Sequence, residues 1–159
     1  MDAWVLVHHI GLVAFLLVHG ISVGVAIRLR REREPERVRA LLDLSFGAVG
    51  VVHLSLLVLL AGGIGAGIVG HFFDEGWIWA SLSLLVAMWG AMSFLGTRHY
   101  DRVRLAVGLK PFYGKVEPGP PAPPEELEAL LSSSRPWLLV GIGVASLVVI
   151  LWLMVYQPF

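Results

Sequence analysis

Four histidines lie within long apolar stretches of the sequence, and they are the residues best suited to chemistry there. They are His8, His9, His19 and His53. No Asp, Glu, Lys or Arg sits in the middle of any apolar stretch, so ionisable chemistry at depth rests on imidazole. Ionisable groups inside a membrane are costly and usually face the interior of a helix bundle. An imidazole in that position can ligate haem iron, bind another metal ion or carry a proton.

The depths of these histidines predict a haem site. Counted at 1.5 Å per residue, His8 lies ~6 Å and His53 ~12 Å below the outer membrane boundary, on different predicted helices. His8, with His9 as the alternate, therefore matches His53 in depth, which is the geometry of bis-histidine haem b ligation. Gly11 and Gly50 lie near these histidines in the sequence and could leave room for a flat macrocycle.

His19 offers a second arrangement. It follows His8 by eleven residues, so the two side chains project within ~20° of each other from one helix face. At a depth of ~22 Å it is level with Met92 of the third apolar stretch. A His/Met site for haem iron or a soft metal ion is therefore the alternative. A histidine in a span can also merely hydrogen-bond a neighbouring helix, and that interpretation stays open for each of these residues.

Four apolar stretches must position these residues. They run from about Trp4 to Ile27, Leu41 to Gly70, Trp77 to Thr97 and Pro136 to Tyr156. Each reaches the ~20 residues that a helix needs to cross a ~30 Å hydrocarbon core. We therefore predict an all-α protein, a single four-helix transmembrane bundle over residues 1–159. The second stretch exceeds the thickness of the core, so it must tilt, protrude or break.

Basic residues gather on one side of this predicted bundle. Of the 12 Lys and Arg residues, half lie in residues 28–40 and half in residues 98–135. Basic residues that flank spans stay in the cytoplasm, so we expect both termini outside. The first stretch is long and has no basic segment before it, so we expect direct insertion rather than signal cleavage. Acidic residues share the inner side and the net charge is +0, which argues against a nucleic-acid partner.

The composition narrows the remaining chemistry. Cysteine is absent, which excludes disulfides, thiolate metal sites, iron–sulfur clusters and covalent haem attachment. Small residues at four-residue spacing occur in every span, as in Gly20/Gly24 and Gly63/Gly67, and they let helices approach closely. We expect them to serve packing inside the bundle. Contacts in a homo-oligomer or a larger membrane complex are the alternative.

The opening of the chain resembles a known class of membrane protein. The segment WVLVHHIGLVAFLLVHGISVGVAIRLRRER is similar to the first span of small bacterial integral-membrane proteins related to the copper-resistance D and HemJ-type families. An early span in these families carries a histidine, small residues and a basic inner end, matched here by His8 or His9, Gly11, Gly20 and Gly24. The resemblance covers mainly residues 4–33 and the four-helix layout. It implies haem b or metal handling, with an early-span histidine as ligand.

These observations favour a haem b protein of the bacterial inner membrane that transfers electrons. Besides the lipid bilayer, its expected partner is quinone or a redox membrane protein. The alternative is a non-catalytic accessory subunit, in which glycines pack and histidines only form hydrogen bonds. A small metal or solute transporter is a third hypothesis, disfavoured because the spans lack the carboxylates that usually carry protons or sodium ions. The sequence leaves open whether the chain is an enzyme.

Overall fold

The computed structural model describes residues 2–159, which are mostly helical. The helices, in chain order, are α1 (Asp2–Leu29), α2 (Pro35–Gly70), the 3-10 turn η1 (Phe72–Asp74), α3 (Gly76–Ala91), the π-helical turn η2 (Met92–Gly96), α4 (Thr97–Ala106), α5 (Pro124–Leu131) and α6 (Arg135–Tyr156). The described residues contain no strand. Four helical segments are long and apolar enough to cross a membrane, which confirms the predicted all-α protein with four spans.

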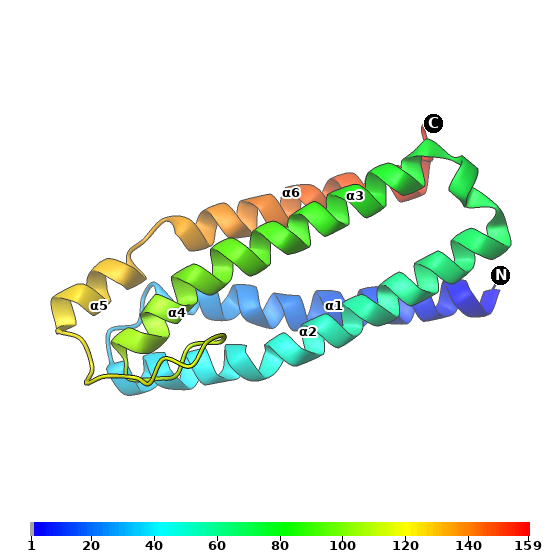
Figure 1. Cartoon of the computed structure of the whole chain (residues 1–159). Coiled ribbons are helices and arrows are strands. Elements are labelled where there is room, and N and C mark those ends of the chain that lie inside the picture. Colours follow the sequence, from blue (N-terminus) through cyan, green and yellow to red (C-terminus); the bar gives the residue numbers. More distant parts are fainter. Residues whose placement is uncertain (1) are drawn as a thin grey trace.

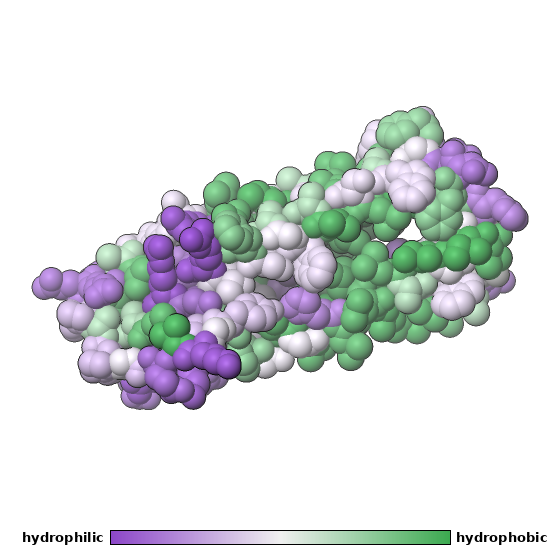
Figure 2. All heavy atoms as spheres, in the orientation of Figure 1, coloured by the Kyte–Doolittle hydropathy of each residue, from purple (hydrophilic) through white to green (hydrophobic). Residues whose placement is uncertain are grey.

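The spans form two helix pairs (Figure 1). α1 packs antiparallel on α2 along most of its length, and α3 packs on α6, whereas the two pairs touch each other little. Both chain ends and residues 71–75 lie at one end of the bundle, here called the terminal end. The arginine-rich connections lie at the opposite end, here called the basic end. Figure 2 shows hydrophilic surface at the basic end and apolar side chains over the middle of the bundle.

α2 is longer than its apolar stretch because it begins within the polar connection. Pro35 occupies its first turn, where the missing N–H removes no helical hydrogen bond. The helix runs unbroken through its glycine-rich segment and ends at His71, whose left-handed backbone (φ 57°) lets its N–H reach the carbonyls of Gly67 and Ile68. Of the expected responses to excess length, α2 therefore does not break within its apolar stretch.

The third span is a continuous rod of α3, η2 and α4. It continues through the polar segment RHYDRVRLA and stops before Gly108. The φ of 77° at Gly108 favours glycine, which explains the stop. Within the rod, the π-helical turn Met92–Gly96 interrupts the regular α-helical hydrogen bonds. Single π turns inside α-helices occur frequently at functional sites.

Two glycines set the closest approach of α1 to α2. A Cβ on Gly11 would overlap the backbone of Leu59, and a Cβ on Gly62 would lie 2.7 Å from the Cα of His8. The two helices therefore touch backbone to backbone, as small residues permit in membrane bundles. The two contacts also fix the register of α1 on α2, because each helix places its glycine three residues, or ~4.5 Å of helix rise, from the residue that the other glycine contacts.

The glycines at four-residue spacing, Gly20, Gly24 and Gly63, do not contact the backbone of a neighbouring helix. Gly63 faces the imidazole of His8 rather than a helix backbone. Gly20 and Gly24 are exposed, and a Cβ on either would meet nothing within 4 Å. The spacing therefore indicated close packing of helices but not the glycines that provide it.

A buried apolar cluster joins α1, α2, α4 and α5 at the basic end. Its most deeply buried members are Val38, Leu42, Val103 and Val107. Arg104 is buried beside this cluster, and its guanidinium donates to the carbonyls of Lys110 (2.6 Å) and Leu42 (3.2 Å). The same guanidinium lies over the rings of Phe46 and Phe112. The buried charge is thus hydrogen-bonded and stacked, which offsets the cost of removing it from water.

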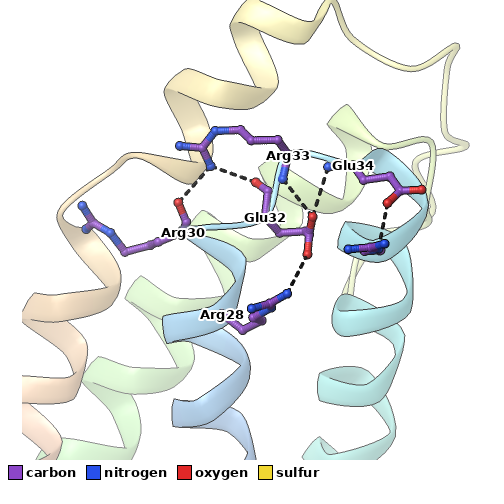
Figure 3. A network of polar contacts seen from close by, with 6 residues as sticks. Arg28, Arg30, Glu32, Arg33 and Glu34 are labelled. Carbon is purple, nitrogen blue, oxygen red and sulfur yellow. Dashed lines mark hydrogen bonds and ion pairs between the residues drawn. The ribbon is translucent and has the colours of Figure 1, made fainter.

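A second buried charge, Glu32, organises the connection between α1 and α2 (Figure 3). Its carboxylate accepts hydrogen bonds from the N–H groups of Glu34 (3.3 Å) and Arg33 (3.1 Å) and from the Arg28 guanidinium (3.5 Å). The two backbone donors, followed by the charges of Arg37 and Arg28, lower the pKa of Glu32, although its burial acts in the opposite direction. The turn is therefore stabilised by the ionised carboxylate.

Gly62→Ala should destabilise the protein by about 1–3 kcal/mol, the usual cost of adding atoms to a tight contact. The added Cβ would collide with the backbone of His8, which cannot rotate away. The matched control is Gly50→Ala on the same helix, which meets open space and should be neutral or stabilising by up to ~1 kcal/mol through helix propensity. Denaturant unfolding in mild detergent, followed by circular dichroism, measures both. Equal stability of the two variants would contradict the backbone contact.

Pro120→Cys should react with a membrane-impermeant maleimide only after the cells are permeabilised, whereas Glu75→Cys should react in intact cells. The chain has no other cysteine, so each label reports one position. The expected result follows from the retention of basic segments in the cytoplasm, because position 120 lies between basic residues and position 75 lies at the terminal end. Labelling of position 120 in intact cells would show that the orientation is the reverse of the predicted one.

Glu32→Gln should lower the free energy of unfolding at neutral pH and should have a diminishing effect in acid. A carboxyl whose pKa is lowered by folding stabilises the folded state above its ordinary pKa, here 4.5, and loses that contribution as pH falls through the folded value. Unfolding of wild type and variant between about pH 7 and about pH 3 tests the sign. The control is Glu125→Gln on the exposed start of α5. A wild-type advantage that is as large in acid as at neutral pH would refute this role.

Candidate functional site

Two cavities lie between the helix pairs. The inner cavity, nearer the basic end, has a volume of about 210 Å³, and the outer cavity, nearer the terminal end, has a volume of about 400 Å³. Figure 2 shows an opening through the surface between the pairs near the terminal end. Residues of all four spans line both cavities, and no Asp, Glu, Lys or Arg does so. Among the described residues, the titratable groups that line these cavities are imidazoles and, in the inner cavity, the phenols of Tyr100 and Tyr113.

Hydrogen bonds fix the tautomer of the histidines that line the cavities. The Nδ1 of His53 lies 2.7 Å from the carbonyl oxygen of Val49, and the Nδ1 of His8 lies 2.9 Å from that of Leu59. A carbonyl oxygen only accepts, so Nδ1 carries the proton in both residues. In the neutral form of each imidazole, Nε2 then carries the lone pair. This pattern is typical of metal-ligating histidines, whose other ring nitrogen donates to a backbone carbonyl.

The inner cavity brings together His19, His53 and Met92 from three different spans. His19 stacks on Phe15, with ring centroids 5.4 Å apart, and makes no hydrogen bond within the described residues. The Cε of Met92 lies 2.8 Å, and the Nε2 of His19 3.8 Å, from the point that a Cβ on Gly143 would occupy. The absent side chain at Gly143 on α6 therefore leaves the space in which these two side chains meet.

His53 forms another part of the inner cavity wall. Its ring lies edge-on to Trp89, with the centroids 6.1 Å apart. Met92 opens the π-helical turn, and Ser93, Thr97 and Tyr100 add hydroxyl groups to the lining. The arrangement joins two imidazoles, one thioether and several hydroxyl groups in a mostly apolar space. These are ligand types for haem iron and for soft metal ions.

The partnership of His8 with His53 as haem ligands stays a prediction, and the structure places the two residues in the linings of different cavities. The depths were counted from the ends of the apolar stretches, whereas α2 begins in the polar connection. The contact of Gly62 with His8 places His53 further toward the basic end, near the level of His19. The alternative His19/Met92 arrangement is the one whose residues share a cavity.

The two glycines expected to make room for a macrocycle do not do so. The space beside Gly11 is filled by the backbone of Leu59. Gly50 is exposed, and it lines neither cavity. His9 is exposed, and its Nδ1 donates to the carbonyl of Val5 in its own helix (2.7 Å). In residues 2–159 there is no group of three or more His, Cys, Asp or Glu side chains that could hold a metal ion.

Sequence reasoning missed three contributors to these cavities. Gly143 carries no signal beyond its small size, and Ser81 is an ordinary serine of an apolar span. Ser81 is 3% exposed, lines the outer cavity, and its hydroxyl has no hydrogen-bond partner among the described residues. The π-helical turn at Met92 also has no signature in the sequence.

The chain matches no family model, curated protein or solved structure.

Proposed function

We propose that this chain is a multi-pass membrane protein that binds haem b at the inner cavity and transfers electrons within the membrane. The observation that carries the proposal is the gathering of His19, His53 and Met92, all axial-ligand types, around one cavity between helices. His53 is the first ligand because its Nε2 is free while Nδ1–H is anchored on the carbonyl of Val49. His19 or Met92 is the second ligand.

The histidine and methionine side chains are suitable ligands for haem iron. The porphyrin ring fits between the helix pairs only if both cavities contribute space. The inner cavity of about 210 Å³ is smaller than the ~300–1,000 Å³ of typical ligand sites. The outer cavity adjoins it where Phe15 stacks on His19. A macrocycle would extend past this stack, and the two helix pairs can separate to admit it because they touch each other little.

Haem b supplies a one-electron redox centre when it is bound. Two side chains of this chain that both held the iron would favour electron transfer over oxygen or substrate chemistry. The chain holds the group, orients His53 through Val49 and surrounds it with apolar walls. The partner we propose is quinone or a redox membrane protein, and the setting is a bacterial plasma membrane, as the resemblance of the first span implies. No catalytic step is assigned.

The second candidate is a non-catalytic accessory subunit of a larger membrane complex. One observation favours it: His8, His9 and His53 each already donate a hydrogen bond to a backbone carbonyl of this chain. Such bonds satisfy a buried donor without any cofactor. A transporter is less favoured, because no carboxylate lines either cavity.

Reduced-minus-oxidised spectra of purified protein test the haem site. Wild type, expressed with ample haem and purified in mild detergent, should show a Soret band with sharp α and β bands. In His53→Ala the haem affinity should fall by at least the ~10–100-fold that loss of a ligand's hydrogen-bond partner costs. Met92→Leu and His19→Ala identify the second ligand, since only loss of that ligand should change the spin state.

His8→Ala and His71→Ala are the matched controls, because neither residue lines the inner cavity. Both should keep the wild-type spectrum. A colourless wild type under haem-replete conditions would contradict the haem proposal and favour the accessory subunit. If His8→Ala abolished the haem spectrum and His53→Ala preserved it, the haem would be assigned to the outer cavity.

A further inference from the structure

The outer cavity has the form of a separate binding site for an organic molecule. Its volume of about 400 Å³ lies within the range of cofactor and ligand sites. Its walls are apolar and aromatic, with Phe72 and Trp77 in contact at the terminal end, where the ring centroids are 5.7 Å apart. Along α1, His8 is eleven residues from His19, or about 16 Å of helix rise. The far end of the outer cavity is thus remote from the proposed iron ligands.

Two polar groups stand on opposite walls of this cavity. His8, on the α1/α2 pair, offers an Nε2 lone pair, since its Nδ1–H donates to the carbonyl of Leu59. Ser81, on the α3/α6 pair, has a buried hydroxyl with no partner in the described chain. Buried polar groups in native proteins nearly always have a partner, so an unpaired hydroxyl facing a cavity indicates a bound group. His8 and Ser81 thus present one acceptor and one hydroxyl that can donate, and His9 and Gln157 also line the cavity.

We propose that the outer cavity binds the head ring of a lipid-soluble quinol. A hydroquinone is a flat apolar ring with oxygens on opposite sides. One of its hydroxyls would donate to His8 Nε2, and its other oxygen would accept from the Ser81 hydroxyl. Its apolar tail would leave between the helix pairs into lipid. Neither His8 nor Ser81 lines the inner cavity. The proposed haem ring would pass Phe15 into the outer cavity, so the quinol ring would occupy the other end of that cavity, beside His8, which is seven residues from Phe15 along α1.

The cavity chemistry selects this class among membrane molecules. A phospholipid headgroup is charged, and no Lys or Arg lines the cavity to receive it. A long-chain alcohol carries a single oxygen and cannot form hydrogen bonds with both His8 and Ser81 on opposite walls. A quinone has two acceptor oxygens and no donor, so it would satisfy Ser81 but not His8 Nε2. The reduced ring should therefore bind more tightly than the oxidised ring.

Binding of a short-chain probe, decylubiquinol, to the purified full-length chain tests the site. Quenching of tryptophan fluorescence, in mild detergent and without oxygen, should saturate for wild type. Ser81→Ala should weaken binding roughly three- to tenfold, the effect of one net hydrogen bond. Its control is Ser83→Ala, an exposed serine of the same helix that lines neither cavity. Decylubiquinone should bind several-fold more weakly than decylubiquinol, and His8→Leu should remove that difference.

Three results would overturn the proposal. They are quenching that rises without saturation, equal affinity of Ser81→Ala and Ser83→Ala, or full competition by hexadecanol. Repeating the titration on His53→Ala separates this site from the haem site, because His53 lies outside the outer cavity. Quinol binding retained in that variant supports the outer site whether or not haem is bound. Should His8→Leu fail to fold, Ser81→Ala and the redox preference still decide the outcome.

Discussion

The rest of the structure depends on the backbone contact between α1 and α2. Gly11 admits the backbone of Leu59, and Gly62 admits that of His8, so neither helix can shift without a steric clash. The hydrogen bond from His8 to the Leu59 carbonyl secures the same register. This register sends His8 to the outer cavity and leaves His53 with His19 at the inner one. Packing of the first helix pair therefore decides which histidines can act together.

The second constraint is the contrast between tight pairs and a loose interface between them. α1 packs on α2 and α3 on α6, while the apolar cluster that joins α1 and α2 to α4 and α5 lies at the basic end. At the basic end, Arg104 and Glu32 satisfy their charges within the protein, so this end is held by both polar and apolar contacts. Between the ends, the packing across the interface includes Leu85 against the cluster of Phe15 and Leu59 and the ring of Trp89 against His53. Such a design leaves space for a group inside the bundle without disturbing either pair.

Much of the fold could be predicted from the sequence because hydropathy and length dictate it. Four apolar stretches had to become four spans, and the helical continuation up to Gly108 follows from glycine's access to positive φ. The site was harder, because the pairing of histidines depends on register, and register depends on contacts that no spacing rule reveals. Nothing in the sequence shows that Gly11 and Gly62 belong to the same helix contact. The count of residues along each apolar stretch could therefore not give the level of His53 relative to α1. The unpaired Ser81 hydroxyl was also invisible, since a serine in a span usually bonds its own helix.

The two sites share one property, which is that no Asp, Glu, Lys or Arg among the described residues lines either cavity. A neutral imidazole whose Nδ1–H is held by a carbonyl presents a lone pair, as His8 and His53 both do. A lone pair in an apolar space binds either a metal ion or a hydroxyl donor. The inner site adds Met92, which suits iron, and the outer site adds the Ser81 hydroxyl, which suits a second oxygen. One tautomer, set twice by backbone carbonyls, thus favours metal ligation in one cavity and quinol recognition in the other.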